Sequence, residues 1–198
     1  MNRVIVTAFI LSAVGLVSCD NKSNEAYIEP LEVKVNQSPD VKSPQVSLVK
    51  KGDVVERLIA RDPSDNGGMI EDATLLYDHF GEIEARDISN SLWAGINGFD
   101  RNRRAAGAIA VIAFEDEPRD WSTVRAGIAY VNGLGVNQNA TKAISILSQP
   151  SLSESSAAQF FLAKAYQLDN QNTKAKLHFE KAANMGHRLA KEELAKQN

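Results

Sequence analysis

The stretch Tyr130-Val131-Asn132-Gly133-Leu134-Gly135-Val136, followed by Lys142-Ala143, decides the fold that the sequence predicts. Its glycines permit the positive φ values of a sharp helix exit, and its last residue, Val136, can return an apolar side chain to the core. Beyond it, apolar residues recur at the spacing of one helix face, at Ala140, Ala143, Ile144 and Leu147. The pattern therefore predicts two antiparallel helices joined by a tight turn, in a unit spanning about residues 119–149.

A second copy of the pattern follows at about residues 152–186. Tyr166 and Lys174-Ala175 take the places of the tyrosine and of the Lys-Ala pair, and the copy closes with Phe179-Glu180-Lys181-Ala182-Ala183-Asn184-Met185-Gly186. Its turn is shorter than the first and contains no glycine. A helix pair that occurs twice predicts an all-α fold.

These residues resemble the Sel-one-like repeat, a relative of the tetratricopeptide repeat. The motif Tyr-x-x-Gly-x-Gly-Val is matched in full, whereas Asn139 replaces the usual aspartate and Ala163 replaces a glycine in the second copy. The resemblance implies a short right-handed α-solenoid of antiparallel helix pairs, an architecture that binds proteins and specifies no chemistry by itself. It also implies that the repeats are defined by Gly127, Tyr130, Gly133, Gly135, Val136, Lys142, Ala143, Tyr166, Ala182, Ala183 and Gly186.

The helical repeat domain is predicted to span residues 52–198. Residues 188–196 form a strongly charged terminal helix, and a polar outer face is what a capping element needs. Because solenoids usually need about three units, residues 85–117 are interpreted as a degenerate earlier repeat.

Turn residues set the expected helix ends. Helices are predicted over 52–60, over 70–80 with Gly81 as a stop, and over 85–97 with Gly98 as a stop and Ile88, Leu92, Ile96 and Phe99 on one face. The expected N-caps of later helices are Asp100, Ser151 with Glu154 as a capping box, and Asn172. The helix after Asp100 stops before Pro118, and its charged ends, Arg103-Arg104 and Glu115-Asp116-Glu117, are expected to be solvated.

Residues 1–18 have the form of an export signal. A short positive start precedes an apolar run over 4–17 that is too short to span a membrane. The end of this run, Leu16-Val17-Ser18-Cys19, resembles a bacterial lipobox, which implies lipidation of Cys19 with a diacylglyceryl group on its sulfur. The alternative is an ordinary secretory signal that happens to contain a cysteine.

Residues 19–51 are interpreted as the lipidated N-terminus and a flexible tether. Prolines interrupt every candidate helix there, and polar residues between them leave no apolar face. The expected location is the bacterial cell envelope, anchored by lipid and facing the periplasm. Asp20 resembles a retention signal and favours the inner membrane over the outer one.

Composition excludes several function classes. The chain has 198 residues, of which 43% are hydrophobic, so it can bury a core. A net charge of -3 argues against nucleic-acid binding. The single cysteine excludes a disulfide framework, and His79, His178 and His187 lack neighbours at metal spacing. No catalytic motif is present, so the sequence predicts no enzyme, no metal site and no cofactor.

A binding groove is expected on a second apolar stripe of the first repeat helix, at Trp121, Val124, Ile128 and Val131. In tetratricopeptide-like solenoids this face lines the concave groove, and the matching positions of the next unit are Phe160, Lys164 and Gln167. The alternative is that the stripe packs against the helix before Pro118.

Three functions remain open from the sequence. The leading one is a membrane-anchored adaptor or scaffold that binds an unidentified envelope protein or peptide. The second is an immunity or exclusion lipoprotein that blocks an incoming toxin or conjugation component. The third, an envelope enzyme, has no motif in its favour.

Overall fold

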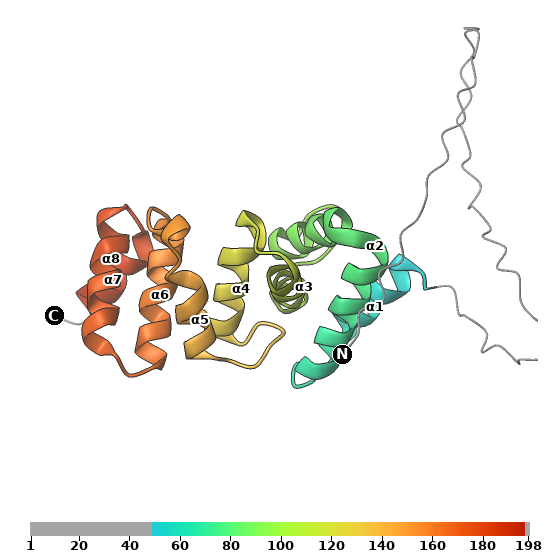
Figure 1. Cartoon of the computed structure of the whole chain (residues 1–198), viewed down its shortest axis with the longest axis horizontal. Helices are drawn as coiled ribbons and strands as arrows, with labels where there is room; N and C mark the ends of the chain where they lie inside the picture. Colours follow the sequence, from blue (N-terminus) through green and yellow to red (C-terminus); the bar gives the residue numbers. More distant parts are fainter. Residues whose placement is uncertain (1–48, 197–198) are drawn as a thin grey trace, which may run out of the picture. The chain divides into compact units, whose positions relative to one another are not determined.

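The computed structural model describes residues 49–196, and every regular element among them is helical. The all-α class is thereby confirmed, whereas the signal peptide, Cys19 and nearly all of the tether lie outside the described residues. The elements are α1 (Lys51–Ala60), α2 (Asn66–Ala94), α3 (Arg103–Asp116), α4 (Asp120–Asn132), α5 (Ala140–Leu147), a 3-10 turn η1 (Pro150–Leu152), α6 (Ser156–Leu168), α7 (Asn172–Asn184) and α8 (Arg188–Ala195) (Figure 1). None of the described helices combines the length and the apolar character that a bilayer crossing requires.

Each helix packs against the next one along the chain, and α4 also contacts α6. The core consists of three groups of buried side chains: one under α1, α2 and α3, one under α3 to α6, and one under α6, α7 and α8. Alanines are frequent in all three groups. Their small side chains allow the helices to approach closely. Because each helix packs against the next one, the core is built from elements that are neighbours in sequence.

The helix α2 differs from expectation. It begins at Asn66, where Asp65 caps it by accepting a hydrogen bond of 2.8 Å from the backbone N–H of Gly68. Gly81 leaves the helical region, with φ 81° and ψ 173°, but the chain resumes helical geometry at once, so the predicted stop is a kink within one element. The second arm ends at Ala94 and not at 97, which leaves Ile96 outside the helix and exposed.

Three of the predicted caps are also corrected. Asn102, not Asp100, caps α3, because its side chain reaches the Ala105 N–H while its own N–H donates to the Leu92 carbonyl at 2.8 Å. Ser155 caps α6, because its side chain accepts a hydrogen bond from the Ala158 N–H, whereas Ser151 lies within η1. The helix α7 already includes Asn172, and its N-cap position is Gln171.

In both predicted turns, the N-cap residue of the second helix donates a backbone hydrogen bond to the tyrosine of the first helix. After α4, Gly133 and Gly135 have φ of 68° and 72°, and the Asn139 N–H donates to the Tyr130 carbonyl at 2.9 Å. After α6, the Gln171 N–H donates to the Tyr166 carbonyl at 2.8 Å. The same type of backbone hydrogen bond therefore closes both turns, although only the first turn contains glycines.

The lysine of each Lys-Ala pair reaches back to the tyrosine of the preceding helix. The Lys142 ammonium lies 4.9 Å from the Tyr130 ring centroid, and the Lys174 ammonium lies 5.3 Å from that of Tyr166. The alanine that follows each lysine is buried. The same side-chain arrangement thus occurs in both helix pairs.

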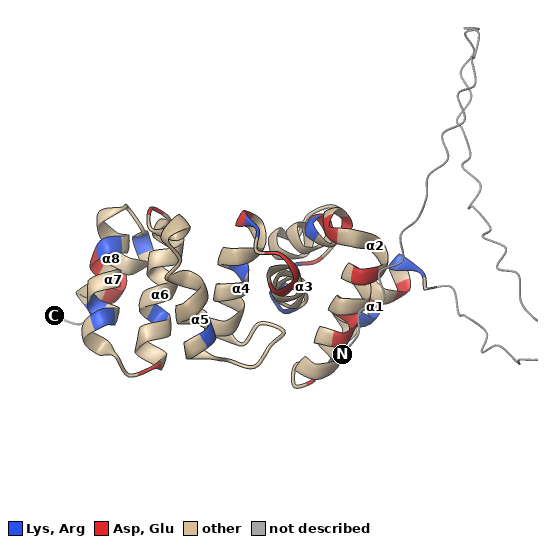
Figure 2. Ribbon diagram, in the orientation of Figure 1, with Lys and Arg blue, Asp and Glu red and all other residues tan. Residues whose placement is uncertain are grey.

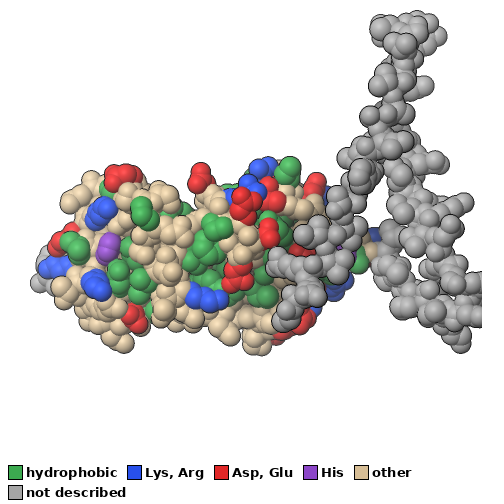
Figure 3. Space-filling view, viewed as in Figure 1, with side chains coloured by type: hydrophobic (Ala, Val, Ile, Leu, Met, Phe, Trp, Pro, Cys, Tyr) green, Lys and Arg blue, Asp and Glu red, His purple; other side chains and the backbone are tan. Residues whose placement is uncertain are grey.

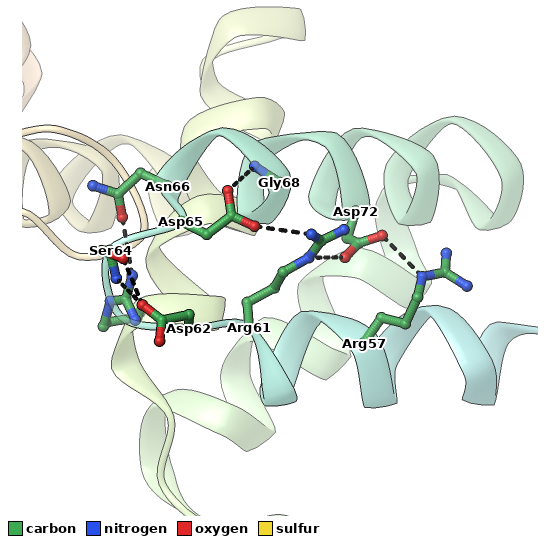
Figure 4. A network of polar contacts seen from close by, with 9 residues as sticks. Arg57, Arg61, Asp62, Ser64, Asp65, Asn66, Gly68 and Asp72 are labelled. Atoms are coloured by element: carbon green, nitrogen blue, oxygen red, sulfur yellow. Dashed lines mark hydrogen bonds and ion pairs between the residues drawn. The ribbon is translucent and has the colours of Figure 1, made fainter.

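A network of charges holds α1 against α2 (Figure 4). Arg57 of α1 and Arg61, the C-cap residue that follows α1, point toward the buried carboxylate of Asp72 in α2, with Nε to Oδ distances of 3.1 and 2.7 Å. Arg61 also pairs with Asp65 at 2.9 Å. Because Asp72 is only 4% exposed, its charge depends on these two guanidinium groups for compensation.

Candidate binding site

A cleft of about 490 Å³ opens between the end of α2, the start of α3 and the facing sides of α4 and α6. Its lining residues are Trp93, Arg103, Ile128, Asn132, Leu134 and Phe161. This volume is in the range of pockets that bind ligands or peptide side chains. The cleft draws on segments that are far apart in sequence, so it exists only in the folded chain.

One side of the cleft is apolar. Ile128, Leu134 and Phe161 form it, and we call these three residues the apolar wall. Ile128 is 9% exposed, whereas Leu134 and Phe161 are half-buried and also pack against the second core group. The wall is continuous with the core, which gives it a fixed shape.

The other side of the cleft presents an indole and a guanidinium. Trp93 is half-buried at the end of α2, and the Arg103 Cζ lies 5.6 Å from its ring centroid. The Arg125 Cζ, from α4, lies 4.9 Å from the same centroid and 5.8 Å from that of Trp121. Two cations therefore lie against one aromatic ring, an arrangement that the ring's electron-rich faces favour.

The Arg125 guanidinium is bound by neutral groups. Its two terminal nitrogens donate to the Ser89 hydroxyl at 2.8 Å and to the Asn90 side-chain oxygen at 3.0 Å. Burial lowers the pKa of Arg125 to about 10, and no carboxylate among residues 49–196 pairs with it. The positive charge is thus fixed in place and only partly solvated.

Arg103 lies in the first turn of α3, directly after its N-cap, Asn102. The helix dipole places partial positive charge at this end, so it disfavours a cation there and favours an anion. The side chain of Arg103 is exposed, and within the described part of the chain it makes no hydrogen bond or ion pair. Its neighbour Arg104 was expected to be solvated but donates to the Pro63 carbonyl and to Asn66.

The predicted groove residues occupy several environments. Ile128 lines the cleft, Val131 is buried in the second core group, and Val124 is partly buried against it. Trp121 packs against the first core group and donates through its ring nitrogen to Glu82 at 2.9 Å.

In the next unit, Phe160 is buried and stacks on His187, with 4.4 Å between the ring centroids. Lys164 lies 3.9 Å from Glu193 of α8, and Gln167 is half-buried. Phe160 and Lys164 therefore lie beside the C-terminal helix pair and not in the cleft. The cleft instead uses Phe161, the next residue along α6.

Sequence reasoning missed Trp93, Arg103, Asn132, Leu134 and Phe161 as members of one site. The repeat motif contains Leu134 and Asn132, but the glycines in it predict a turn and not the lining of a cleft. The sequence places Phe161 with Ala158, Leu162 and Ala165 on one apolar face of its helix, and this spacing predicts a buried side chain. The chain has two tryptophans, Trp93 and Trp121, and Arg125 lies against both rings. Tryptophans near arginines are the signal in the sequence that could have indicated the site.

Charged residues of both signs are distributed over the described helices, as the blue and red segments of the ribbon show (Figure 2). On the face drawn in Figure 3, hydrophobic side chains reach the surface between charged ones. Within residues 49–196, no three His, Cys, Asp or Glu side chains come together as a metal site would require.

The chain matches no family model, no curated protein and no solved structure.

Proposed function

We propose that this chain is a lipid-anchored adaptor of the bacterial cell envelope, whose helical repeats hold a segment of another envelope protein. The observation that carries the proposal is the cleft, which combines the apolar wall with an unpaired Arg103 in a pocket of about 490 Å³. Grooves of this kind, with apolar anchor positions and a few polar groups, suit a helix or an extended peptide.

The repeat assignment is part of this proposal. The shared turn hydrogen bond and the recurring Lys-to-Tyr contact support two related helix pairs, as in the Sel-one-like repeat. The additional contact between α4 and α6 is what stacking of successive pairs produces. A right-handed solenoid is the arrangement that we propose for these pairs.

The anchor is supported by the sequence alone. The apolar run over 4–17 and the lipobox-like end at Cys19 support export followed by lipidation. Two or three acyl chains, at about 0.8 kcal/mol per buried methylene, give stable membrane attachment. Periplasmic orientation follows from this route, and Asp20 favours the inner membrane.

Site-specific photo-crosslinking in cells tests the adaptor function. We would place benzoylphenylalanine at Asn132 and, separately, at Phe161, both in the cleft, with Leu177 of α7 as the control because it is 61% exposed and does not line the cleft. The proposal predicts that both cleft positions cross-link to one segment of one resident envelope protein and that Leu177 does not.

Different proteins from the two cleft positions, or equal yields from Leu177, would argue against a specific site. Capture of a toxin or of a conjugation component from another cell, in place of a resident protein, would favour the immunity function over the adaptor.

A further inference from the structure

The chemistry of the cleft suggests what kind of segment it takes. Arg57, Arg61, Arg86, Arg119 and Arg188 each pair with a carboxylate, and Arg101 and Arg104 donate to backbone carbonyls. Among the arginines of the described chain, Arg103 alone has no hydrogen-bonding partner, although it borders a cleft. The Arg103 guanidinium is therefore available to pair with a negative charge that a partner supplies.

The surroundings of Arg103 add to the positive potential at this edge of the cleft. Arg125 brings a second guanidinium to Trp93 and is itself hydrogen-bonded only to the neutral Ser89 and Asn90. The first turn of α3 contributes the positive end of the helix dipole. A bound anion would be favoured by all three, and it would relieve the repulsion between the two arginines.

The planar guanidinium favours a carboxylate as the anion. Arginine presents N–H donors in a fork that matches the two oxygens of a carboxylate, and such charge-assisted pairs are stronger than neutral hydrogen bonds. The Trp93 ring limits the orientations of the Arg103 side chain, so less conformational entropy is lost on binding.

We propose that the cleft selects segments in which a carboxylate stands next to a bulky apolar side chain, with Arg103 binding the carboxylate and the apolar wall receiving the apolar group. Arg125 acts as a positioning residue that holds Trp93 and adds positive charge. This inference rests on the proposed function, because it specifies the partner segment that the adaptor recognises.

Short capped peptides test this selectivity on the full-length chain in detergent. The probes are acetyl-Leu-Glu-Phe-amide and its neutral counterpart acetyl-Leu-Gln-Phe-amide, and the readout is the NMR shift of the Trp93 indole N–H. The glutamate peptide should bind about two- to fivefold more tightly, which is the range expected for an arginine–carboxylate pair at an exposed position. The difference should shrink at high salt.

Variants locate the effect. Arg103→Gln should remove the preference for glutamate, and Arg103→Lys should retain part of it, because lysine keeps the charge but lacks the fork. Arg188→Gln is the matched control, since Arg188 is exposed on α8 and away from the cleft. Acetyl-Leu-Phe with a free terminal carboxylate, compared with its amide, shows whether a chain terminus serves as well as a side chain.

Equal affinity for the two peptides, unchanged by Arg103→Gln, would overturn the carboxylate selectivity while leaving the cleft as a binding site. Failure of the proposed function itself would appear separately, as the absence of cross-links from Asn132 and Phe161. A Trp93 signal that no peptide shifts, or that shifts with protein concentration alone, would also overturn the inference. In those cases the cleft is filled by the chain itself or by a second copy.

Discussion

Gly127 of α4 packs directly against the side chain of Leu147 of α5. A Cβ added at Gly127 would lie 2.5 Å from both Cγ and Cδ2 of Leu147, closer than such atoms can approach. The helices α4 and α5 therefore touch at a position where any side chain would force Leu147 to shift.

Gly127→Ala should lower the free energy of unfolding by about 1–3 kcal/mol, because a methyl group must displace Leu147 or separate the helices. Urea denaturation of the full-length chain measures the change. Gly52→Ala is the matched control, since Gly52 is also helical and has no atom within 4 Å of its added Cβ. Alanine's helix propensity should make that control neutral or more stable by up to about 1 kcal/mol.

A Leu147→Ala background sharpens this prediction. In that background, Gly127→Ala should lower the free energy of unfolding by less than it does in the wild-type chain, because the Leu147 side chain that clashes with the new methyl group is absent. An equal cost in both backgrounds would show that the contact is not the cause.

Asp72→Asn should destabilise the chain by about 2–3 kcal/mol. It leaves Arg57 and Arg61 facing a neutral group, although the partial exposure of both arginines limits the loss. Asp78→Asn, on the same helix and exposed, should change the stability by less than about 0.5 kcal/mol. Similar losses from both substitutions in a denaturation experiment would contradict the role of the network.

Acidification should destabilise the domain through His178 and His187. Burial lowers the pKa of both rings below 6.5, and Lys181 and Arg188, respectively, act in the same direction. The Nδ1 atom of His187 is buried and has no hydrogen-bond partner among the described residues.

Since the unfolded chain binds these protons more readily, their stabilising contribution is complete above about pH 6.5 and is lost as the pH falls through the folded pKa values. The melting temperature should therefore fall between pH 7.5 and pH 5.5. This window lies above the titration of Asp62 and Asp65, whose pKa values are lowered from 3.8. His178→Gln and His187→Gln should each weaken the pH dependence, and an unchanged dependence in both variants would contradict this role.

Cys19→Ser should yield an uncleaved precursor or a soluble periplasmic product, because no thiol remains to accept the lipid. Incorporation of labelled palmitate and sensitivity of processing to globomycin are the measurements. A wild-type chain that takes up no label would contradict the lipoprotein hypothesis.

The elements that follow from local chemistry were predictable from the sequence. Gly133 and Gly135 have the positive φ values that their motif requires, and Val136 is buried after them. The end of α2 was not predictable in the same way, because Gly95 and Gly98 both have positive φ and only the first caps the helix. Likewise Asp100 and Asn102 are both good caps, and the tertiary hydrogen bond from Asn102 to Leu92 decides between them.

The cleft depends on contacts that periodicity within one helix does not contain. Trp93, Arg103 and Arg125 come from three helices, and their meeting depends on how α2, α3 and α4 pack. Phe161 lies on the apolar face of α6, as predicted, but the contact between α4 and α6 leaves part of its ring open to the cleft. An apolar stripe on a helix predicts which side chains face the core, but it does not predict which of them remain accessible from a cleft.

The loop between α4 and α5 connects more than its own two helices. At Gly135 the backbone is so close to Ala108 of α3 and Met69 of α2 that an added Cβ would lie 2.9 Å from each, and Asn137 accepts a hydrogen bond of 3.0 Å from Asn66 at the start of α2. The shorter turn after α6 is closed by its own backbone hydrogen bond. We therefore expect α2 to α5 to unfold as one cooperative unit, and α7 and α8 to open from the C-terminal end without it. Amide hydrogens of α7 and α8 should then exchange with solvent through local opening, whereas those of α3 and α4 should exchange only when the whole unit unfolds.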